Sequence, residues 1–330
     1  MMNKIKKIYS ETDHRMRGIF FASMTALLWG FLPIALKIAV EEVNPVTVSW
    51  IRFVVAFLVL FLIFVIRSPK SLSIIKNPPW LLIIASVGLA LNYVAYIAGV
   101  KLTSPSNAQV IIQVAPIFLA LIGLVVFKEK ISTVQGAGLV LAVMGFTFFY
   151  GDQLAGFLGP QSDYNSGTLL VIFSAMSWVV YATIQKKLVQ KYPPQSLNIV
   201  IYGFPALLLA PFVDYSGLAQ LSFSFWLLMI FLGLNTLAAY GALAEAFKYI
   251  EVNKVGIIIT LNPIITIISM HVLEYFQVSW IQPESISYYG LIGALLIISG
   301  AILAVRSKGK SEFKELEEQQ LQVIPKSKPV

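Results

Sequence analysis

Long apolar runs, each close to the length of a membrane-spanning helix, alternate with short polar segments along most of the chain. A helix needs roughly 20 mainly apolar residues to cross a bilayer. Ten segments come near that length, and the predicted spans are residues 18–40, 45–66, 80–101, 105–127, 132–150, 167–187, 196–213, 225–249, 254–273 and 287–305. Turn signals such as residues 77–79 (NPP) and 193–194 (PP) separate them. The pattern predicts an all-α integral membrane protein with ten transmembrane helices.

The two halves of the chain also repeat each other, weakly but in register. Nine residues recur at displacements of 149, 147 or 155 positions. The pairs are Gly18 with Gly167, Trp29 with Trp178, Lys37 with Lys186, Pro45 with Pro194, Tyr93 with Tyr240, Lys101 with Lys248, Pro116 with Pro263, Gly138 with Gly293 and Gly145 with Gly300. Because five spans is an odd number, the second repeat must enter the membrane in the opposite sense. Inverted repeats of this kind are typical of secondary transporters, whose cargo binds where the repeats meet.

The loops indicate how the chain is organised and oriented. Basic residues collect in one alternate set of loops and acidic residues in the other, which places both termini in the cytoplasm by the positive-inside rule. The first apolar run is too long for a cleavable signal peptide, so we expect it to be retained. The predicted organisation is a cytoplasmic N-terminal segment at 1–17, a first repeat at 18–150, a second repeat at 167–305 and a disordered cytoplasmic tail at 306–330.

Composition excludes several other classes of protein. Hydrophobic residues make up 58% of the 330 residues and charged residues 12%, about half the usual share of roughly 25% in soluble proteins. The net charge of +8 is spread over short loops, which favours membrane orientation over nucleic-acid binding. The chain has no cysteine, only two histidines and no nucleotide-binding or metalloprotease motif. We therefore expect no enzyme activity, no cofactor and no metal site.

Several short motifs occur in a fixed order within the spans. They are residues 26–30 (ALLWG), 115–117 (API), 127–131 (FKEKI), 135–138 (QGAG), 262–264 (NPI) and 273–275 (LEY), followed by Gly290, Gly293 and Gly300. In order and spacing they resemble the EamA family of the drug/metabolite transporter (DMT) superfamily, over residues 18–305. The resemblance implies ten helices in two inverted five-helix repeats. The second half departs from it, because Val179 follows Trp178 and residues 276–285 have no counterpart in the first half.

Polar side chains concentrate on the third, fourth, eighth and ninth predicted spans. Such side chains are costly in lipid, so they face the bundle interior or a wet cavity. The candidate substrate-binding residues there are Asn92, Tyr93, Tyr96, Asn107, Gln113, Asn235, Tyr240, Thr260 and Asn262, with Gln109 and Thr236 in the same polar set. The alternative is that they only join helices, at about 0.6 kcal/mol per contact. Trp29 and Trp178 are further candidates, which either line the cavity or pack at the symmetry axis.

A few ionisable residues fall inside the predicted spans. Arg52 lies roughly 10 Å into the second span, where a charge costs at least about 2.5 kcal/mol, so it either binds an anionic group or extends to the surface. Glu245 is the one carboxylate well inside a span, and it either couples transport to protons or pairs with Lys248. His271 is a second, weaker coupling candidate because imidazole titrates near neutral pH.

Together these features predict a secondary carrier in the inner membrane that rocks one repeat against the other. We expect an exporter of a small metabolite, such as an amino acid or a related compound. Its partners would be that small-molecule substrate and the lipid bilayer, with no nucleic acid, and the sequence specifies no oligomeric state. The alternatives are a channel or a structural membrane protein that transports nothing.

Overall fold

The computed structural model describes residues 2–115, 117–118, 122, 132–157, 163–281 and 288–305. The longer helices are α1 (Met2–Glu42), α2 (Pro45–Arg67), α3 (Trp80–Leu102), α6 (Thr133–Phe157), α7 (Asp163–Leu188), α8 (Pro194–Leu209), α10 (Phe223–Tyr249), α12 (Asn262–Tyr275) and α13 (Tyr288–Val305). The shorter ones are η1 (Pro69–Ile75), α4 (Pro105–Ile111), η2 (Ala210–Phe212), α9 (Tyr215–Leu218) and α11 (Val252–Ile259). All regular structure in these residues is helical, as the apolar pattern predicts.

Six helices among the described residues are long and apolar enough to cross a membrane. They are His14–Glu42, Pro45–Arg67, Trp80–Leu102, Asp163–Leu188, Pro194–Phe212 and Phe223–Tyr249. Two shorter apolar helices, Gly136–Phe149 and Tyr288–Gly300, occupy the predicted fifth and tenth spans. The first helix begins well before the predicted start at residue 18, because α1 runs from Met2. The predicted tail at 306–330 lies outside the described residues.

The predicted fourth and ninth spans are interrupted near their middles. α4 ends in a turn at Ile112 and Gln113, and much of the rest of that span lies outside the described residues. α11 and α12 are separated by a turn at Thr260 and Leu261. Pro263 lies in the first turn of α12, where its missing N–H is tolerated but where a helix arriving from α11 would lose a hydrogen bond. Gln113 and Thr260 are 147 positions apart, so the two breaks occupy equivalent places in the repeat.

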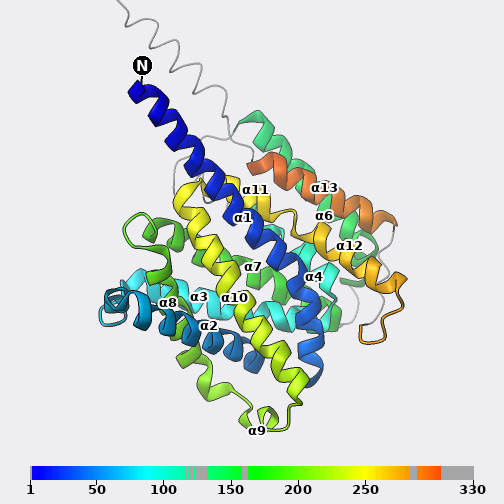
Figure 1. Ribbon diagram of the computed structural model, residues 1–330. Coiled ribbons are helices and arrows are strands. Elements are labelled where there is room, and N and C mark those ends of the chain that lie inside the picture. Colours follow the sequence, from blue (N-terminus) through cyan, green and yellow to red (C-terminus); the bar gives the residue numbers. More distant parts are fainter. Residues whose placement is uncertain are drawn as a thin grey trace, which may run out of the picture.

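Three antiparallel helix pairs join the two halves of the chain: α1 with α10, α3 with α7, and α6 with α13 (Figure 1). Glycines permit the close approach. A Cβ on Gly18 of α1 would lie 2.5 Å from Ile250, just beyond α10, and one on Gly167 of α7 would lie 2.8 Å from Thr103, just beyond α3. Both pairs obey the repeat displacements, so the two contacts are equivalent.

The first helices of the two halves run in opposite directions. Lys37, near the end of α1, reaches carbonyl groups at the end of α3, so α1 and α3 finish at the same end of the bundle. α7 is antiparallel to α3, because Asn92 of α3 bonds to Ser174 while Gly99, further along α3, lies against Gly167 at the start of α7. α7 therefore starts at the end of the bundle where α1 finishes.

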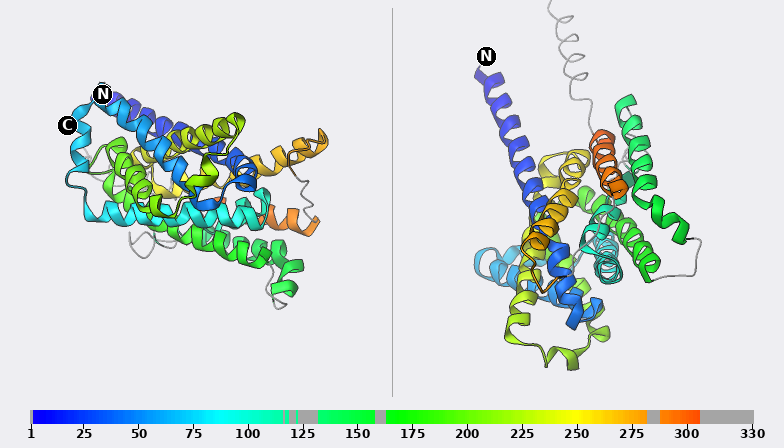
Figure 2. Two further views of the ribbon diagram at one scale, coloured as in Figure 1. Left: turned by 90° about the horizontal axis from the view of Figure 1, so that it is seen from below. Right: turned by 90° about the vertical axis from the view of Figure 1, so that its right-hand side faces the viewer.

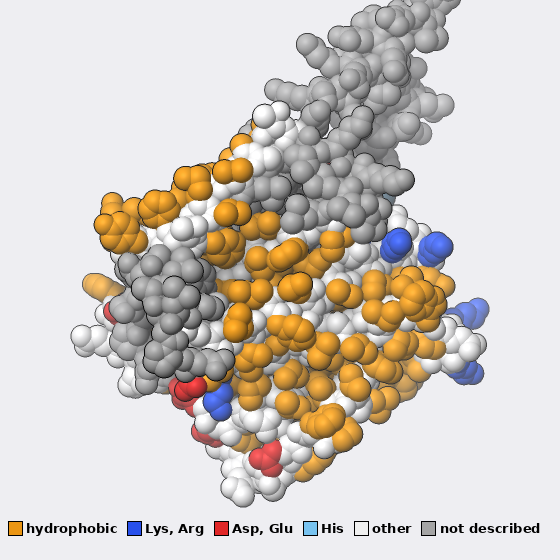
Figure 3. Space-filling view, turned by 180° about the vertical axis from the view of Figure 1, so that it is seen from behind, with side chains coloured by type: hydrophobic (Ala, Val, Ile, Leu, Met, Phe, Trp, Pro, Cys, Tyr) orange, Lys and Arg blue, Asp and Glu red, His pale blue; other side chains and the backbone are white. Residues whose placement is uncertain are grey.

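The outside of the bundle is strongly apolar. The α6–α13 pair stands at one edge, beside the other helices (Figure 2). Large side chains such as Ile66, Leu207 and Phe223 are more than three-quarters exposed. Figure 3 shows hydrophobic side chains spread across the described part of one face, with basic groups mainly at one end and acidic groups at the other. This is the surface expected of a protein that meets lipid along its middle and water at its two ends.

Candidate functional site

A cavity of about 70 Å³ lies in the middle of the bundle, between the two halves of the chain. Its walls come from α1, α2, α3, α4, α7, α10, α11 and α12, together with the turn that follows α4. The lining residues are Trp29, Leu32, Arg52, Asn92, Tyr93, Tyr96, Gln109, Ile112, Gln113, Ala115, Trp178, Tyr240, Ile259 and Asn262. The structure thus brings most of the predicted substrate-binding residues to one place.

Aromatic rings form much of the wall. Trp29 and Trp178, which the repeat relates, have ring centroids 6.0 Å apart in an edge-to-face arrangement. Tyr93 and Tyr240, also related by the repeat, are 5.6 Å apart, and Tyr240 lies 5.1 Å from Trp29. Rings packed at these distances and angles are rigid and combine apolar faces with polar edges. Both Trp29 and Trp178 therefore line the cavity, one of the two roles that the sequence left open.

Arg52 points inward rather than toward the end of the bundle. It is only 2% exposed, and its Nε donates a hydrogen bond to Thr236 Oγ1 of α10 at 3.0 Å. Its guanidinium carbon lies 4.2 Å from the centroid of the Tyr93 ring, a cation–π distance. Thr236 also accepts a hydrogen bond from the Tyr93 hydroxyl at 3.3 Å. These contacts fix the charge at the cavity wall.

Amide side chains hold the broken segments against the cavity. Pro33 has no N–H, so the carbonyl of Trp29, four residues earlier in α1, loses its helical partner. Gln109 of α4 replaces that partner, because its Nε2 donates to the Trp29 carbonyl at 2.8 Å, while its Oε1 accepts from the Tyr96 hydroxyl at 3.1 Å. Gln113 then donates to the Gln109 carbonyl at 3.1 Å. The turn of α1 before Pro33 and the turn after α4 are thereby tied together.

Two further amides connect helices while facing the cavity. Asn92 donates to both the carbonyl and the hydroxyl of Ser174, which links α3 to α7. Asn262, with its amide oriented to satisfy its neighbours, donates to the carbonyls of Ile259 and Ala26 at 2.9 and 3.0 Å. For these residues the two roles predicted from the sequence, cavity lining and helix joining, are combined in one side chain.

Three predicted binding residues do not line the cavity. Asn107 stays at the start of α4, where it donates to Ser104 Oγ. Asn235 donates to the Leu28 carbonyl of α1 at 3.1 Å, and Thr260 is fully buried in the turn between α11 and α12. These positions stabilise helix ends and helix contacts.

The two predicted coupling residues also lie away from the cavity. Glu245, near the end of α10, accepts a hydrogen bond from Gln195 Nε2 at 3.3 Å. Among the described residues it forms no ion pair with Lys248, the alternative that the sequence left open. His271 is exposed beside an apolar groove formed by α12 and the start of α13, with its Nδ1 3.0 Å from the Ile267 carbonyl. Neither residue contacts the central site.

One polar residue and several aliphatic residues line the cavity although they were not among the predicted binding residues. Gln109 belongs to the polar set but was not among the predicted binding residues, although its spacing of four from Gln113 places both on one helix face. Leu32, Ile112 and Ile259 carry no polar signal at all, because apolar residues inside a membrane protein look alike whether they face lipid, core or cavity. The described residues contain no cluster of metal-binding side chains.

An all-helical bundle with a lipid-facing surface and a central polar and aromatic cavity defines a polytopic membrane protein of the transporter class. The sequence pattern of the EamA-like transporter family matches residues 16–151 and 165–306, one match in each half. The chain belongs to the EamA-like transporter family, which confirms the resemblance seen in its motifs and its two-repeat architecture.

Known proteins agree with this assignment. An uncharacterized transporter of Haemophilus influenzae is 32% identical over 87% of this chain and 94% of its own length. The uncharacterized inner membrane transporter YhbE of Escherichia coli K12 is 30% identical over 86% of this chain and 90% of its own length. A solved crystal structure shares the fold with a TM-score of 0.64 at 20% identity, covering 87% of this chain and 95% of that one. The chain is thus a multi-pass membrane transporter.

Proposed function

We propose that this transporter is a secondary active carrier that exports a small metabolite by alternating access through the central cavity. In this proposal ten spans form two inverted five-helix repeats in the inner membrane, with both termini in the cytoplasm. The cargo is an amino acid or a related compound. It is bound by Arg52, by the aromatic wall and by the amides that line the cavity, whereas Asn107, Asn235 and Thr260 hold the frame.

The observation that carries the proposal is that both halves of the chain line one central cavity. α1 and α7, the first helices of the two halves, run in opposite directions, as an inverted repeat requires. The broken segments after α4 and between α11 and α12 both reach the cavity. A site of this kind can be exposed to either side when one repeat rocks against the other.

Charge supports the orientation. On the face drawn in Figure 3 the basic side chains lie mainly at one end, and basic ends of membrane bundles face the cytoplasm. The relative YhbE is named an inner membrane transporter, which favours the same membrane for this chain.

The test uses the purified full-length protein. A thermal-shift screen against amino acids and organic acids identifies compounds that raise its melting temperature, and each hit is then measured as a radiolabelled compound in proteoliposomes. A carrier gives saturable uptake with counterflow, which means transient accumulation driven by unlabelled compound inside. Saturable uptake without counterflow would indicate a channel, and no uptake of any hit would indicate a structural role.

A pair of variants on α10 links transport to the cavity. Tyr240→Ala removes a ring from the cavity wall and should reduce counterflow at least about tenfold. Phe231→Leu changes a ring on the same helix that is 50% exposed on the outer surface, and it should leave counterflow unchanged. Equal activity in the two variants would remove the cavity from the transport path.

A further inference from the structure

The cavity carries one formal positive charge, and its described lining carries no negative charge. Arg52 is the one basic residue among the lining residues, which include neither Asp nor Glu. The Nε of Arg52 donates to Thr236, and the Tyr93 ring covers one face of the guanidinium. The two terminal nitrogens of Arg52 form no hydrogen bond with the described residues. A buried guanidinium with unused donors is unfavourable, and a bound anion would supply both the charge and the acceptors that it lacks.

A second feature at the same cavity also favours an anion. The 14-residue helix α12 begins at Asn262, which lines the cavity. The start of a helix carries a partial positive charge, and half-helices that begin at mid-membrane direct this charge at anionic groups in transporters. The remaining wall, from Trp29, Trp178, Tyr240 and Ile259, is aromatic or aliphatic and suits an apolar body.

We propose, on the basis of the carrier function above, that the substrate is an organic monoanion. A single carboxylate pairs with Arg52, and an apolar body without an ammonium group packs against the aromatic wall. A zwitterion would bring an ammonium group into a cavity whose described lining offers it no carboxylate. The proposal thus narrows the cargo from amino acids to their relatives that lack the amine.

Two matched sets of probes test this ligand class by binding in detergent. The aromatic set is 3-phenylpropionate, phenylalanine and phenethylamine, and the aliphatic set is 4-methylpentanoate, leucine and 3-methylbutylamine. Within each set the apolar body is similar and the charged groups differ. Binding is read from Trp fluorescence, since Trp29 and Trp178 line the site. In at least one set the carboxylate should bind about tenfold or more tightly than the zwitterion, and the amine should not bind.

Arg52 variants complete the experiment. Arg52→Gln removes the charge and should abolish carboxylate binding, whereas Arg52→Lys keeps the charge and should retain part of it. Three outcomes would overturn the proposal that the substrate is a monoanion. They are tighter binding of a zwitterion or an amine than of the carboxylate, no binding of either carboxylate, and carboxylate binding that survives Arg52→Gln. If Arg52→Gln does not fold, the wild-type probe ranking still decides. Carboxylate binding without counterflow would instead overturn the carrier function and leave the ligand class standing.

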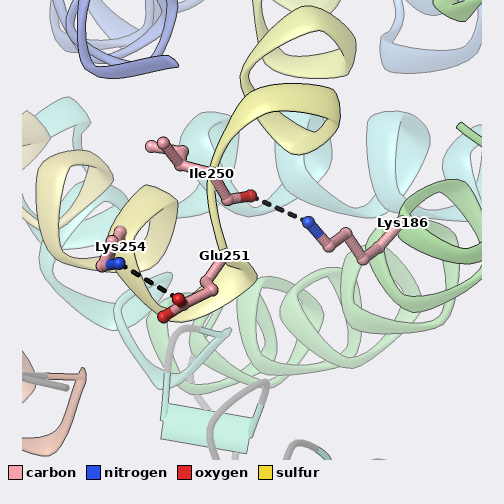
Figure 4. Close-up of polar contacts among 4 residues, drawn as sticks. All are labelled: Lys186, Ile250, Glu251 and Lys254. Atoms are coloured by element: carbon pink, nitrogen blue, oxygen red, sulfur yellow. Dashed lines mark hydrogen bonds and ion pairs between the residues drawn. The ribbon is translucent and has the colours of Figure 1, made fainter. Parts of the chain in front are cut away.

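A second inference rests on two lysines that are independent of the cavity charge. Lys37 Nζ, near the end of α1, donates to the carbonyls of Val100, Lys101 and Thr103 at 3.3, 3.0 and 3.1 Å. Lys186 Nζ, near the end of α7, donates to the carbonyls of Phe247 and Ile250 at 2.7 and 2.8 Å, and Figure 4 shows the second of these bonds. An ammonium group at the end of a helix satisfies carbonyls that the helix leaves unpaired.

The repeat relates the two contacts to each other. Lys37 and Lys186 are 149 positions apart, while Thr103 and Ile250 are 147 apart. Each lysine joins the first helix of its half to the end of the third, at the point where the chain enters a broken segment that borders the cavity. Because α1 and α10 are antiparallel, the two contacts lie at opposite ends of the bundle.

We infer that the Lys37 and Lys186 contacts close the two ends of the cavity. We call each lysine contact a latch, and the helix junction that it holds closed a gate. Release of Lys37 frees the junction of α3 and α4, and release of Lys186 frees the junction of α10 and α11. Both lysine contacts are formed in this structure, which agrees with the small cavity volume of about 70 Å³. Transport would then require that the latches open one at a time.

Cysteine accessibility tests the gates, because the natural chain contains no cysteine. Ala115→Cys places one thiol at the cavity wall, and a membrane-impermeant maleimide is applied to membrane vesicles of either orientation. Adding Lys37→Met should raise the labelling rate about tenfold from the end where Lys37 lies, and adding Lys186→Met should do so from the opposite end. Lys37→Arg and Lys186→Arg, which keep the positive charge, should label like the parent.

Neighbouring exposed lysines provide controls that leave both latches intact. Lys187 follows Lys186 on α7 and Lys101 lies beside the Lys37 contact, so methionine at either position should not change the labelling rate. Labelling that rises equally from both sides, or from neither, would overturn the gates. If the methionine variants fail to reach the membrane, the lysines are needed for folding rather than for gating, and the gate proposal is overturned as well.

Discussion

The two halves of this transporter share a frame but differ in the chemistry that the frame holds. The frame is set by close helix contacts at glycine that occur twice, such as Gly18 on Ile250 and Gly167 on Thr103. The lysines that bind helix-end carbonyls also occur twice. Contacts of this type depend on small residues or on backbone groups, so a repeat preserves them without matching the rest of the sequence.

The cavity groups do not follow the repeat in the same way. Arg52 of the first half corresponds to Ile201 of the second, and Tyr96 corresponds to Leu243, at the same displacements that relate the frame contacts. Both second-half residues are fully buried. The charge and several hydrogen-bonding groups therefore belong to the first half, whereas the second half contributes mainly rings and aliphatic groups. In the proposed carrier, the charged end of the substrate consequently faces α2 and α3.

The largest loss of stability is expected when an arginine is placed in the second half at the position equivalent to Arg52. Ile201→Arg would bury a guanidinium where the residue that corresponds to Thr236 is Leu89, so the hydroxyl that accepts the Arg52 hydrogen bond has no counterpart. The unpaired charge should cost about 3 kcal/mol or more, and the variant should be recovered poorly from membranes. Size-exclusion profiles and melting temperatures in detergent measure the loss.

Ile201→Leu is the matched control, since it keeps an apolar side chain of equal size and should lower stability only slightly. A well-folded Ile201→Arg protein would show that the second half tolerates the charge as readily as the first. The difference in chemistry between the halves would then not be fixed by their surroundings.

A smaller loss of stability, of similar size in the two halves, is expected when equivalent glycines of the frame are replaced. A Cβ on Gly145 of α6 would lie 2.5 Å from the Ile297 amide nitrogen, and one on Gly300 of α13 would lie 2.4 Å from the Ala142 amide nitrogen. Backbone atoms cannot rotate away, so Gly145→Ala and Gly300→Ala should each cost about 1–3 kcal/mol. Unfolding titrations with SDS in mixed micelles measure both.

Gly241→Ala on α10 is the control, because its Cβ would meet only Gln195 side-chain atoms, at ordinary contact distances of 3.5 Å or more. That variant should be neutral or slightly stabilising, since alanine favours a helix over glycine. Very different losses at Gly145 and Gly300 would argue against a symmetric frame at the α6–α13 contact.

The sequence predicted the frame better than the site. Apolar length and repeat displacement located the helices and paired Tyr93 with Tyr240, because those signals are periodic and survive in a single sequence. The break after α4 falls at Ile112 and Gln113, several residues before Pro116, and no local residue type marks it. Pro116 itself lies outside the described residues.

The direction of individual polar side chains could not be predicted in the same way. Asn235 and Asn262 share a residue type and both contact carbonyls of α1, yet only Asn262 lines the cavity. Which face of a membrane helix meets a cavity depends on how neighbouring helices rotate against it, and apolar periodicity is weak where both lipid and core are apolar. Likewise, nothing in the sequence indicates that Lys37 turns to the end of α3 and binds its carbonyls.

The smallest loss of stability is expected when the hydrogen bond from Gln109 to the Trp29 carbonyl is removed, a contact that has no counterpart in the second half. Pro33 frees the Trp29 carbonyl and Gln109 pairs with it, whereas the equivalent positions of the second half are Ala182 and Gly256. Gln109→Leu should cost about 1 kcal/mol, because the freed carbonyl then has no partner. In a Pro33→Ala background the helix supplies its own N–H, so the same substitution should cost clearly less. A double-mutant cycle in SDS unfolding gives the difference directly. A coupling energy near zero would mean that Gln109 does not compensate for the N–H that Pro33 lacks.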